Sequence, residues 1–197
     1  METFVNYLKN IGNYNNKDIV AIKYGLAVIK NELSKFFLFL MFYLLVGRTM
    51  NFLFYFVILS PVRMFTGGIH MKSNFACTVI SFLLSIIPII LLPCIQLHDY
   101  MYYLLQLFTI MTTIVLSPIK NPNRPITTKL RYKNLKKKAS TLIIIANLVL
   151  LVLSFNNLKI YYVIGVWTLF LNALQLLIIK FFNNRKGGDN ENFKNVI

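Results

Sequence analysis

The sequence predicts an all-α, polytopic integral membrane protein. Of its 197 residues, 57% are hydrophobic, which is above the roughly 45–50% of an ordinary soluble domain. Several apolar runs approach the ~20 residues that a helix needs to cross a bilayer. Basic residues flank these runs, as they do beside the spans of membrane proteins. We expect about six transmembrane or re-entrant helices and an N-terminal amphipathic interfacial helix, all within a single integral-membrane domain of the cell membrane, residues 1–197.

Residues 1–33 form the amphipathic N-terminal region. Apolar residues recur at helical spacing, as at Phe4, Leu8 and Ile11, and lysines are interleaved with them. A basic amphipathic helix of this kind lies in the headgroup plane of the membrane. The alternative is a helix that packs against the rest of the protein, and both interpretations stay open. The region has no apolar stretch near its start, so we expect no cleavable signal peptide.

Six apolar segments follow this region. They cover residues 36–46, 50–60, 76–95, 100–117, 140–156 and 160–180. The first two are each only ~16 Å long as helices, which is short of the ~30 Å hydrocarbon core. They therefore form either two tilted spans, extended by flanking residues, or a re-entrant hairpin. Pro88 and Pro93 interrupt the third segment, because proline removes a hydrogen bond from a helix interior.

The distribution of Lys and Arg predicts the orientation in the membrane. The polar loop 120–140 contains eight basic residues, and the N-terminal region and the polar tail 183–197 are also basic. The connections 96–100 and 156–159 contain a single lysine between them. The positive-inside rule therefore predicts that the N-terminus, the loop and the C-terminal tail are cytoplasmic. Counting crossings back from the loop places residues 63–77 at the same cytoplasmic interface.

A net charge of +15 raises the question of nucleic-acid binding. The charges flank apolar segments, and the sequence has no zinc-finger spacing, Gly-rich phosphate loop or basic-aromatic repeat. We therefore expect no nucleic-acid partner and, because no metal-ligating cluster is visible, no cofactor. Along one helix Cys77 and Cys94 would lie ~25 Å apart, which is too far for a disulfide.

The stretch Arg63 to Cys77, RMFTGGIHMKSNFAC, differs from the apolar segments on both sides. It holds one of the two histidines and one of the two cysteines of the chain. A cysteine attacks as its thiolate, and a neighbouring histidine can accept the thiol proton. His70 and Cys77 supply these two groups, and Arg63 adds positive potential that favours a thiolate. The N–H groups of Gly67 and Gly68 are candidates for stabilising an oxyanion.

Helix geometry limits how His70 and Cys77 can meet. Seven residues of straight helix climb ~10.5 Å, which is too far for a direct hydrogen bond between the two side chains. We therefore expect His70 in a turn or a separate short helix. Ser73 or Asn74 would then begin the helix that carries Cys77 near its first turns.

Cys94 and His98 are a rival pair. Their i,i+4 spacing is the better one for a contact on a single helix. They lie, however, at the predicted outer end of a span and have no neighbouring glycines or basic residues. A buried structural thiol and an interfacial histidine are the simpler interpretation of this pair.

The stretch 63–77 resembles the signature of the accessory gene regulator B (AgrB) family, integral-membrane cysteine endopeptidases that process quorum-sensing propeptides. The family pattern has an arginine, then glycine shortly before a histidine, and a cysteine seven residues after that histidine. The corresponding residues here are Arg63, Gly67, Gly68, His70 and Cys77. The segment PNRPI, residues 122–126, is similar to a proline-bounded basic stretch of the family. One departure is Met71, because alanine often follows the histidine in the family.

The resemblance implies a definite reaction. The substrate would be an AgrD-type propeptide with an amphipathic leader, a central signal sequence and an acidic C-terminal tail. Cys77, with His70 as its partner, would remove the tail through an acyl-enzyme. The propeptide's own cysteine or serine would then close a thiolactone or lactone ring. The resemblance also implies a homodimer.

The basic residues of the loop are candidates for binding this substrate. Lys136, Lys137 and Lys138 could attract the acidic tail at ~1 kcal/mol or less per exposed pair. Membrane lipids with anionic headgroups are the competing partner, at ~1 kcal/mol per residue.

Two non-enzymatic classes compete with the peptidase interpretation. One is a small membrane transporter, and the other is a lipid-binding membrane protein. Transport pathways commonly use ionisable residues within the membrane. The interiors of segments 100–117 and 140–156 contain no Asp, Glu, Lys or Arg. We therefore favour the membrane cysteine endopeptidase.

Overall fold

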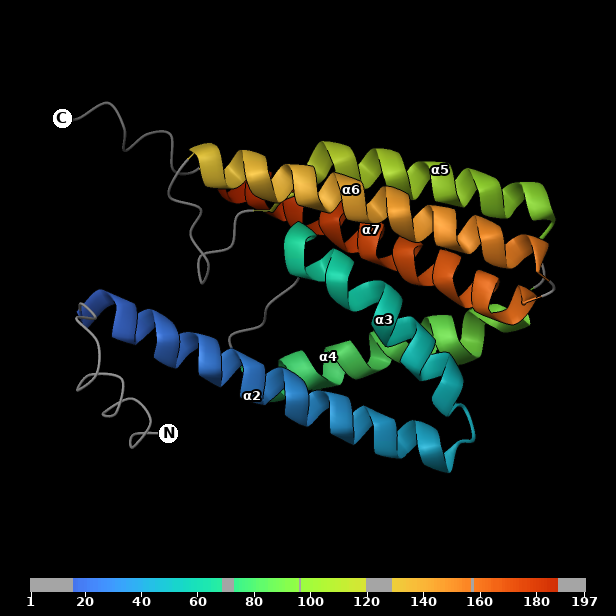
Figure 1. The fold of residues 1–197 in the computed structure, drawn as a ribbon, viewed down its shortest axis with the longest axis horizontal. Coiled ribbons are helices and arrows are strands. Elements are labelled where there is room, and N and C mark those ends of the chain that lie inside the picture. The colour runs from blue at the N-terminus through green and yellow to red at the C-terminus, as the bar shows by residue number, and fades with distance from the viewer. Residues whose placement is uncertain (1–15, 69–72, 96, 120–128, 157, 188–197) are drawn as a thin grey trace. The chain divides into compact units, whose positions relative to one another are not determined.

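The structure is a computed structural model that describes residues 16–68, 73–95, 97–119, 129–156 and 158–187. Helices and the turns between them make up these residues, and no strand occurs among them (Figure 1). The α-helices are α2 (Asn16–Leu45), α3 (Thr49–Thr66), α4 (Asn74–Ile86), α5 (Asp99–Leu116), α6 (Lys129–Phe155) and α7 (Lys159–Gly187). A π-helix, η1 (Ile87–Leu91), and a 3₁₀ helix, η2 (Leu92–Cys94), continue α4. The chain divides into two compact units, residues 1–47 and 48–197.

The core of the second unit lies where α3, α5, α6 and α7 meet (Figure 1). Ring contacts join α5 to α7, with centroid distances of 5.7 Å between Tyr102 and Tyr162 and 5.6 Å between Phe108 and Phe170. α6 approaches α7 closely at Gly165, where a Cβ would collide with the Leu150 side chain of α6. The buried core residues are Ile58, Val62, Tyr102, Ile143, Ala146, Leu150, Tyr162, Val166 and Leu169.

The span that begins with α4 changes its helix type near its end. Pro88 lies in the π-helix η1, and Pro93 lies in the 3₁₀ helix η2. Because proline lacks an N–H, the α-helical ladder cannot continue unchanged past these positions. The predicted interruption of the segment is therefore confirmed. Both η1 and η2 pack against α7, which anchors this end of the span within the second unit.

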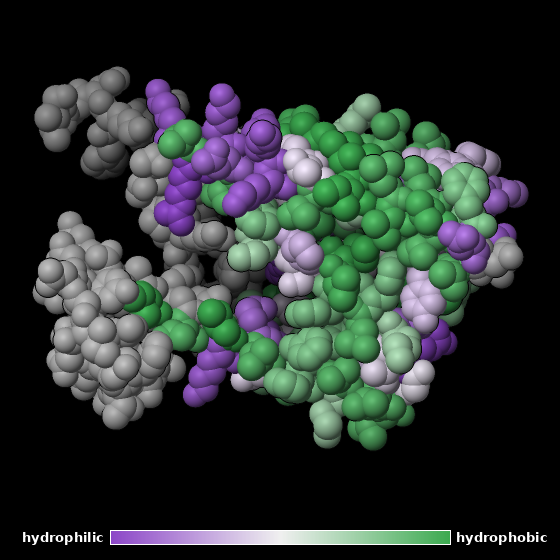
Figure 2. Space-filling view, in the orientation of Figure 1, coloured by the Kyte–Doolittle hydropathy of each residue, from purple (hydrophilic) through white to green (hydrophobic). Residues whose placement is uncertain are grey.

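Five helical segments are long and apolar enough to cross a membrane, which confirms the all-α, polytopic fold class. They are Thr49–Thr66, Phe75–Cys94, Asp99–Leu116, Lys129–Phe155 and Lys159–Phe182. The short apolar segment 50–60 is part of an 18-residue helix, α3, which is ~27 Å long and favours a span over a re-entrant hairpin. On the visible face of the second unit, apolar side chains cover the middle (Figure 2).

α6 begins at Lys129 rather than at residue 140. We expected a polar loop up to Ser140, but the stretch 129–139 is rich in Lys, Leu and Arg, which are good helix formers. Hydrophilic side chains gather over this start of α6 (Figure 2). Residues 120–128, including the segment PNRPI, lie outside the described residues.

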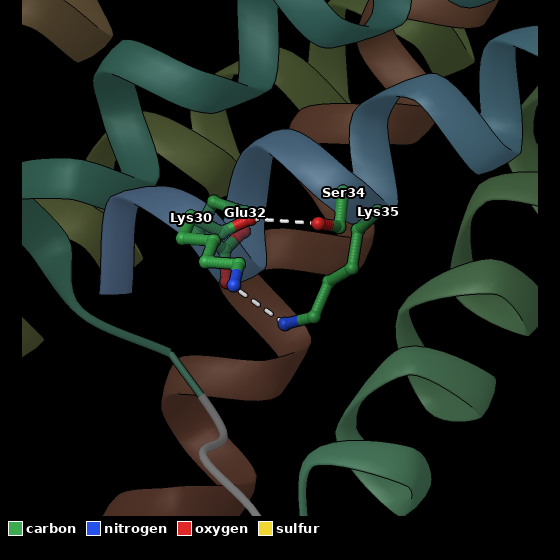
Figure 3. Close-up of polar contacts among 4 residues, drawn as sticks. All are labelled: Lys30, Glu32, Ser34 and Lys35. Carbon is green, nitrogen blue, oxygen red and sulfur yellow. Dashed lines mark hydrogen bonds and ion pairs between the residues drawn. The ribbon is translucent and has the colours of Figure 1, made fainter. Parts of the chain in front are cut away.

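The first unit contains α2, one helix of 30 residues. It joins the predicted amphipathic region to the apolar segment 36–46, which we expected to be separate elements. The stretch contains no proline, so its backbone ladder is unbroken. Lys35 forms an ion pair with Glu32 at 2.8 Å, and the Ser34 hydroxyl donates to the Lys30 carbonyl at 2.9 Å (Figure 3). These charges keep α2 out of the five apolar spans, and residues 1–15 lie outside the described residues.

Candidate functional site

α3 ends at the double glycine of the candidate stretch. Gly67 has a φ of 85°, a left-handed conformation that costs other residues roughly 1–2 kcal/mol. Its N–H donates to the Arg63 carbonyl at 3.0 Å, which closes the last turn of the helix. The Thr66 hydroxyl donates to the Gly67 carbonyl at 3.1 Å. Gly67 therefore ends α3.

Arg63 and Gly68 lie in direct contact. A Cβ added to Gly68 would be 2.6 Å from the Nε of Arg63 and 3.2 Å from its Cζ. Any larger residue at position 68 therefore has to displace the guanidinium. Two residues of the candidate stretch are thus brought into contact where α3 ends.

The end of α3 is hydrogen-bonded to the segment that follows α5. The Ile119 N–H donates to the Thr66 carbonyl at 3.1 Å. The side chains of Thr66 and Ser117 are fully buried. Residues 117–119 are therefore neighbours of the candidate stretch. The stretch 117–126, SPIKNPNRPI, forms part of the family resemblance, but the sequence did not predict that its start lies beside Thr66, because a hydrogen bond between distant segments leaves no spacing pattern.

Cys77 lies in the first turn of α4. The helix begins at Asn74, as predicted, and Ser73 is its N-cap residue, although the Ser73 side chain makes no capping hydrogen bond. The Cys77 N–H donates to the Ser73 carbonyl at 3.0 Å. The side chain is only 9% exposed, and neither this cysteine nor Cys94 forms a disulfide. The candidate nucleophile is therefore a buried thiol, outside any disulfide, at the start of α4.

The histidine of the candidate pair, His70, lies outside the described residues, as does the neighbouring segment 69–72. Its approach to Cys77 therefore stays a prediction. Within the described ranges, no three His, Cys, Asp or Glu side chains gather in a way that could hold a metal ion.

The structure does not place the rival pair, Cys94 and His98, in the helical contact that their i,i+4 spacing would allow. Cys94 ends the 3₁₀ helix η2, whereas His98 is the extended N-cap residue of α5, with φ −62° and ψ 146°. Their i,i+4 spacing therefore does not lie on one helix. The Cys94 thiol donates to the Ile90 carbonyl at 3.4 Å, and the His98 ring stacks on Tyr100 at 5.7 Å. Cys94 is exposed, so the burial that we expected for it is wrong.

The three candidate lysines of α6 do not form one cluster. The Nζ of Lys138 lies 5.5 Å from the centre of the Phe65 ring, a cation–π distance. Phe65 belongs to the candidate stretch at the end of α3, so its aromatic ring is a further member of the site. Lys136 and Lys137 instead line a hollow on the surface of α6.

The helix ends that carry these residues face one side of the second unit. Figure 1 shows the end of α3, the start of α4, the end of α5 and the start of α6 on that side. Asp99 and Lys159 begin α5 and α7 at the opposite side. The buried thiol, the glycine-terminated helix and the basic start of α6 therefore share one boundary of the membrane-spanning unit.

The fold and this site define a class: a polytopic helical membrane protein with a buried cysteine at the start of a spanning helix and, at the same side of the unit, an arginine and two glycines where α3 ends (Figure 1). The family model for accessory gene regulator B matches residues 1–179, and the chain belongs to this family. An AgrB-like protein of Clostridium beijerinckii is 30% identical over 130 residues. The match covers 64% of this chain and 64% of the length of that relative. No solved structure matches the chain.

Proposed function

We propose that this protein is a membrane-embedded cysteine endopeptidase. It removes the C-terminal tail of an AgrD-type propeptide and promotes closure of a thiolactone or lactone ring. Membership of the AgrB family supports involvement in the processing of quorum-sensing peptides. The observation that carries the proposal is the position of Cys77, a buried thiol in the first turn of α4. The other cysteine, Cys94, is exposed and has no adjacent histidine on its helix.

In the first step, the Cys77 thiol gives its proton to His70, and the sulfur attacks the carbonyl carbon at the tail junction. The C–N bond breaks, and the tail leaves as a new N-terminal amine that takes the proton from His70. The rest of the propeptide remains on Cys77 as a thioester. Burial of the thiol limits hydrolysis, because water must be kept from the thioester.

In the second step, a thiol or hydroxyl of the propeptide attacks the thioester carbonyl. Its proton passes through His70 to the Cys77 sulfur, which leaves as the bond to the enzyme breaks. With a thiol, one thioester replaces another, so the free-energy change of this step is small. The reaction consumes no oxidant or reductant, which fits the expectation that the enzyme needs no cofactor.

Arg63, Gly67 and Gly68 have different roles in this proposal. The Gly67 N–H already donates to the Arg63 carbonyl, so Gly68 is the better donor to an oxyanion. The Arg63 guanidinium, held against Gly68, binds the peptide backbone near the scissile bond. Lys138, beside Phe65, provides positive charge that attracts the acidic tail, whereas Lys136 and Lys137 line a separate hollow.

We place both termini and the site on the cytoplasmic side and propose a homodimer as the working form. This placement requires α2 to cross the membrane as well, because the five apolar spans alone would put the two termini on opposite sides. The bias of basic residues toward the start of α6 supports this orientation. A membrane-impermeant maleimide tests it in a Cys94→Ala background, which removes the exposed native thiol. A cysteine in place of Lys133 should then react only in inverted vesicles. The dimer rests on the family resemblance, and crosslinking in native membranes tests it.

The decisive experiment is co-expression with an AgrD-type propeptide. Cys77→Ala and His70→Ala should abolish release of the tail, whereas Cys94→Ala should retain it. A propeptide without its internal cysteine or serine should stall the reaction after the first step. Intact-protein mass spectrometry should then find Cys77 carrying the propeptide without its tail. Tail release by the Cys77→Ala protein would overturn the proposal.

A further inference from the structure

We propose that the hollow on α6 binds an anionic phospholipid from the adjacent leaflet. The hollow has a volume of about 490 Å³ and lies near the start of the helix. Its lining residues are Leu130, Lys133, Asn134, Lys136, Lys137 and Ser140. Three ammonium groups, an amide and a hydroxyl thus surround one space, and all of them can donate hydrogen bonds to a phosphate.

Within the described part of the second unit, no carboxylate lies at this side to balance the charge of the hollow (Figure 1). Between Arg48 and Gly187 the sequence contains one carboxylate side chain, Asp99. That residue begins α5 at the opposite side of the unit (Figure 1). Neighbouring ammonium groups repel one another, and a bound anion relieves this repulsion. The ligand therefore carries the negative charge.

The helix face that holds the hollow continues into the membrane. Residues spaced by three or four positions share one face of a helix, here Lys133, Lys137, Ser140, Ile144 and Leu148. Ile144 and Leu148 are 43% and 55% exposed, so they offer apolar surface directly beyond the hydroxyl of Ser140. The face thus presents charge, then a hydroxyl, then apolar side chains.

This order matches a phospholipid, in which an anionic headgroup is followed by acyl chains. An acidic peptide segment or inorganic phosphate satisfies the lysines but leaves the apolar continuation unused. The proposal assigns Lys133 and Lys137 to lipid and leaves Lys138 with Phe65. It stands independently of the chemistry proposed for Cys77.

Retention of phosphatidylglycerol by the purified full-length protein tests the inference. The protein is reconstituted in phosphatidylcholine nanodiscs with and without phosphatidylglycerol, extracted, and analysed by native mass spectrometry. Lys133→Gln/Lys137→Gln removes two charges from the hollow and should weaken retention about thirtyfold. The matched control Arg131→Gln/Lys138→Gln removes two charges from the other side of the same helix and should retain the lipid.

Further measurements distinguish lipid binding from misfolding of the variants and from recognition of charge alone. Lys133→Arg/Lys137→Arg should preserve retention and the thermal unfolding midpoint, which separates loss of charge from misfolding. Inorganic phosphate, glycerophosphoglycerol and a soluble acidic peptide, each added as a competitor, should displace the lipid poorly because they lack acyl chains. Equal loss of lipid in the hollow variant and its control would overturn the inference. Efficient displacement by any soluble competitor would overturn it too, because the hollow would then recognise charge alone.

Discussion

The ammonium group of Lys138 on α6 lies 5.5 Å from the centre of the Phe65 ring on α3. This contact joins the basic start of α6 to the end of the helix that carries Arg63 and the double glycine. It also separates Lys138 from Lys136 and Lys137, which line the hollow. The three consecutive lysines therefore lie in two different environments in the folded protein.

Breaking the contact between Lys138 and Phe65 should lower the free energy of unfolding slightly, and the effects of substituting the two residues should not be additive. Cation–π contacts at exposed sites contribute ~0.5–1 kcal/mol. The loss of unfolding free energy in the double variant Lys138→Gln/Phe65→Leu should therefore be smaller, by this amount, than the sum of the losses in the two single variants. Thermal unfolding in detergent measures this coupling, and Lys137→Gln combined with Phe65→Leu should be additive. Additive losses for Lys138 and Phe65 would contradict the contact.

Gly68→Ala should affect activity more than stability. The new Cβ displaces the guanidinium of Arg63, which is the flexible end of a side chain, so the unfolding midpoint should change little. Tail release should fall on the order of a hundredfold, because small misplacements of a substrate-positioning group have effects of that size. Arg63→Ala should cause a similar loss.

The double variant of Arg63 and Gly68 separates a shared role from two independent ones. If Gly68 acts by making room for Arg63, Arg63→Ala/Gly68→Ala should be no less active than Arg63→Ala. Full activity of Gly68→Ala would show that tail release does not depend on the position of the Arg63 guanidinium.

Thr113→Val should stabilise the protein by ~1 kcal/mol. Its hydroxyl is buried and has no hydrogen-bond partner among the described residues. Leaving such a group unsatisfied costs ~1–3 kcal/mol, and valine has the same shape without the hydroxyl. Thr109→Val is the matched control, because the Thr109 hydroxyl donates to the Gln106 carbonyl at 2.8 Å. Unfolding midpoints should rise for Thr113→Val only, and a fall would mean that Thr113 has a partner such as water.

Gly165→Ala should destabilise the second unit by ~1–3 kcal/mol, the usual effect of overpacking. A Cβ on Gly165 would collide with the Leu150 side chain, so α6 and α7 could not keep their separation. Leu150→Ala removes the side chain that a Cβ on Gly165 would meet, but it leaves a cavity. The loss of unfolding free energy in the double variant should therefore be smaller than the sum of the losses in the two single variants. An unfolding midpoint that Gly165→Ala leaves unchanged would show that the two helices are not in close contact.

The helices followed largely from local properties of the chain. Apolar run lengths predicted the spans, and Pro88 and Pro93 predicted where the third would be interrupted. Two boundaries were wrong for a shared reason: α2 continues through charged residues, and α6 begins among lysines. Charged residues with good helix propensity continue a helix beyond its apolar part, so hydropathy marks where the membrane segment ends and not where the helix ends.

The residues of the candidate site could be predicted from the sequence, but the contacts between them could not. Arg63, the glycines and Cys77 could be picked out from the sequence alone, because their chemistry contrasts with the apolar runs around them. Only the tertiary structure showed that Arg63 lies against Gly68 and that Lys138 faces Phe65. Residue type and spacing are properties of the chain itself, but contacts between helices depend on packing. Hydrophobic burial drives that packing without direction, so residue type and spacing along the chain do not reveal which side chains will meet.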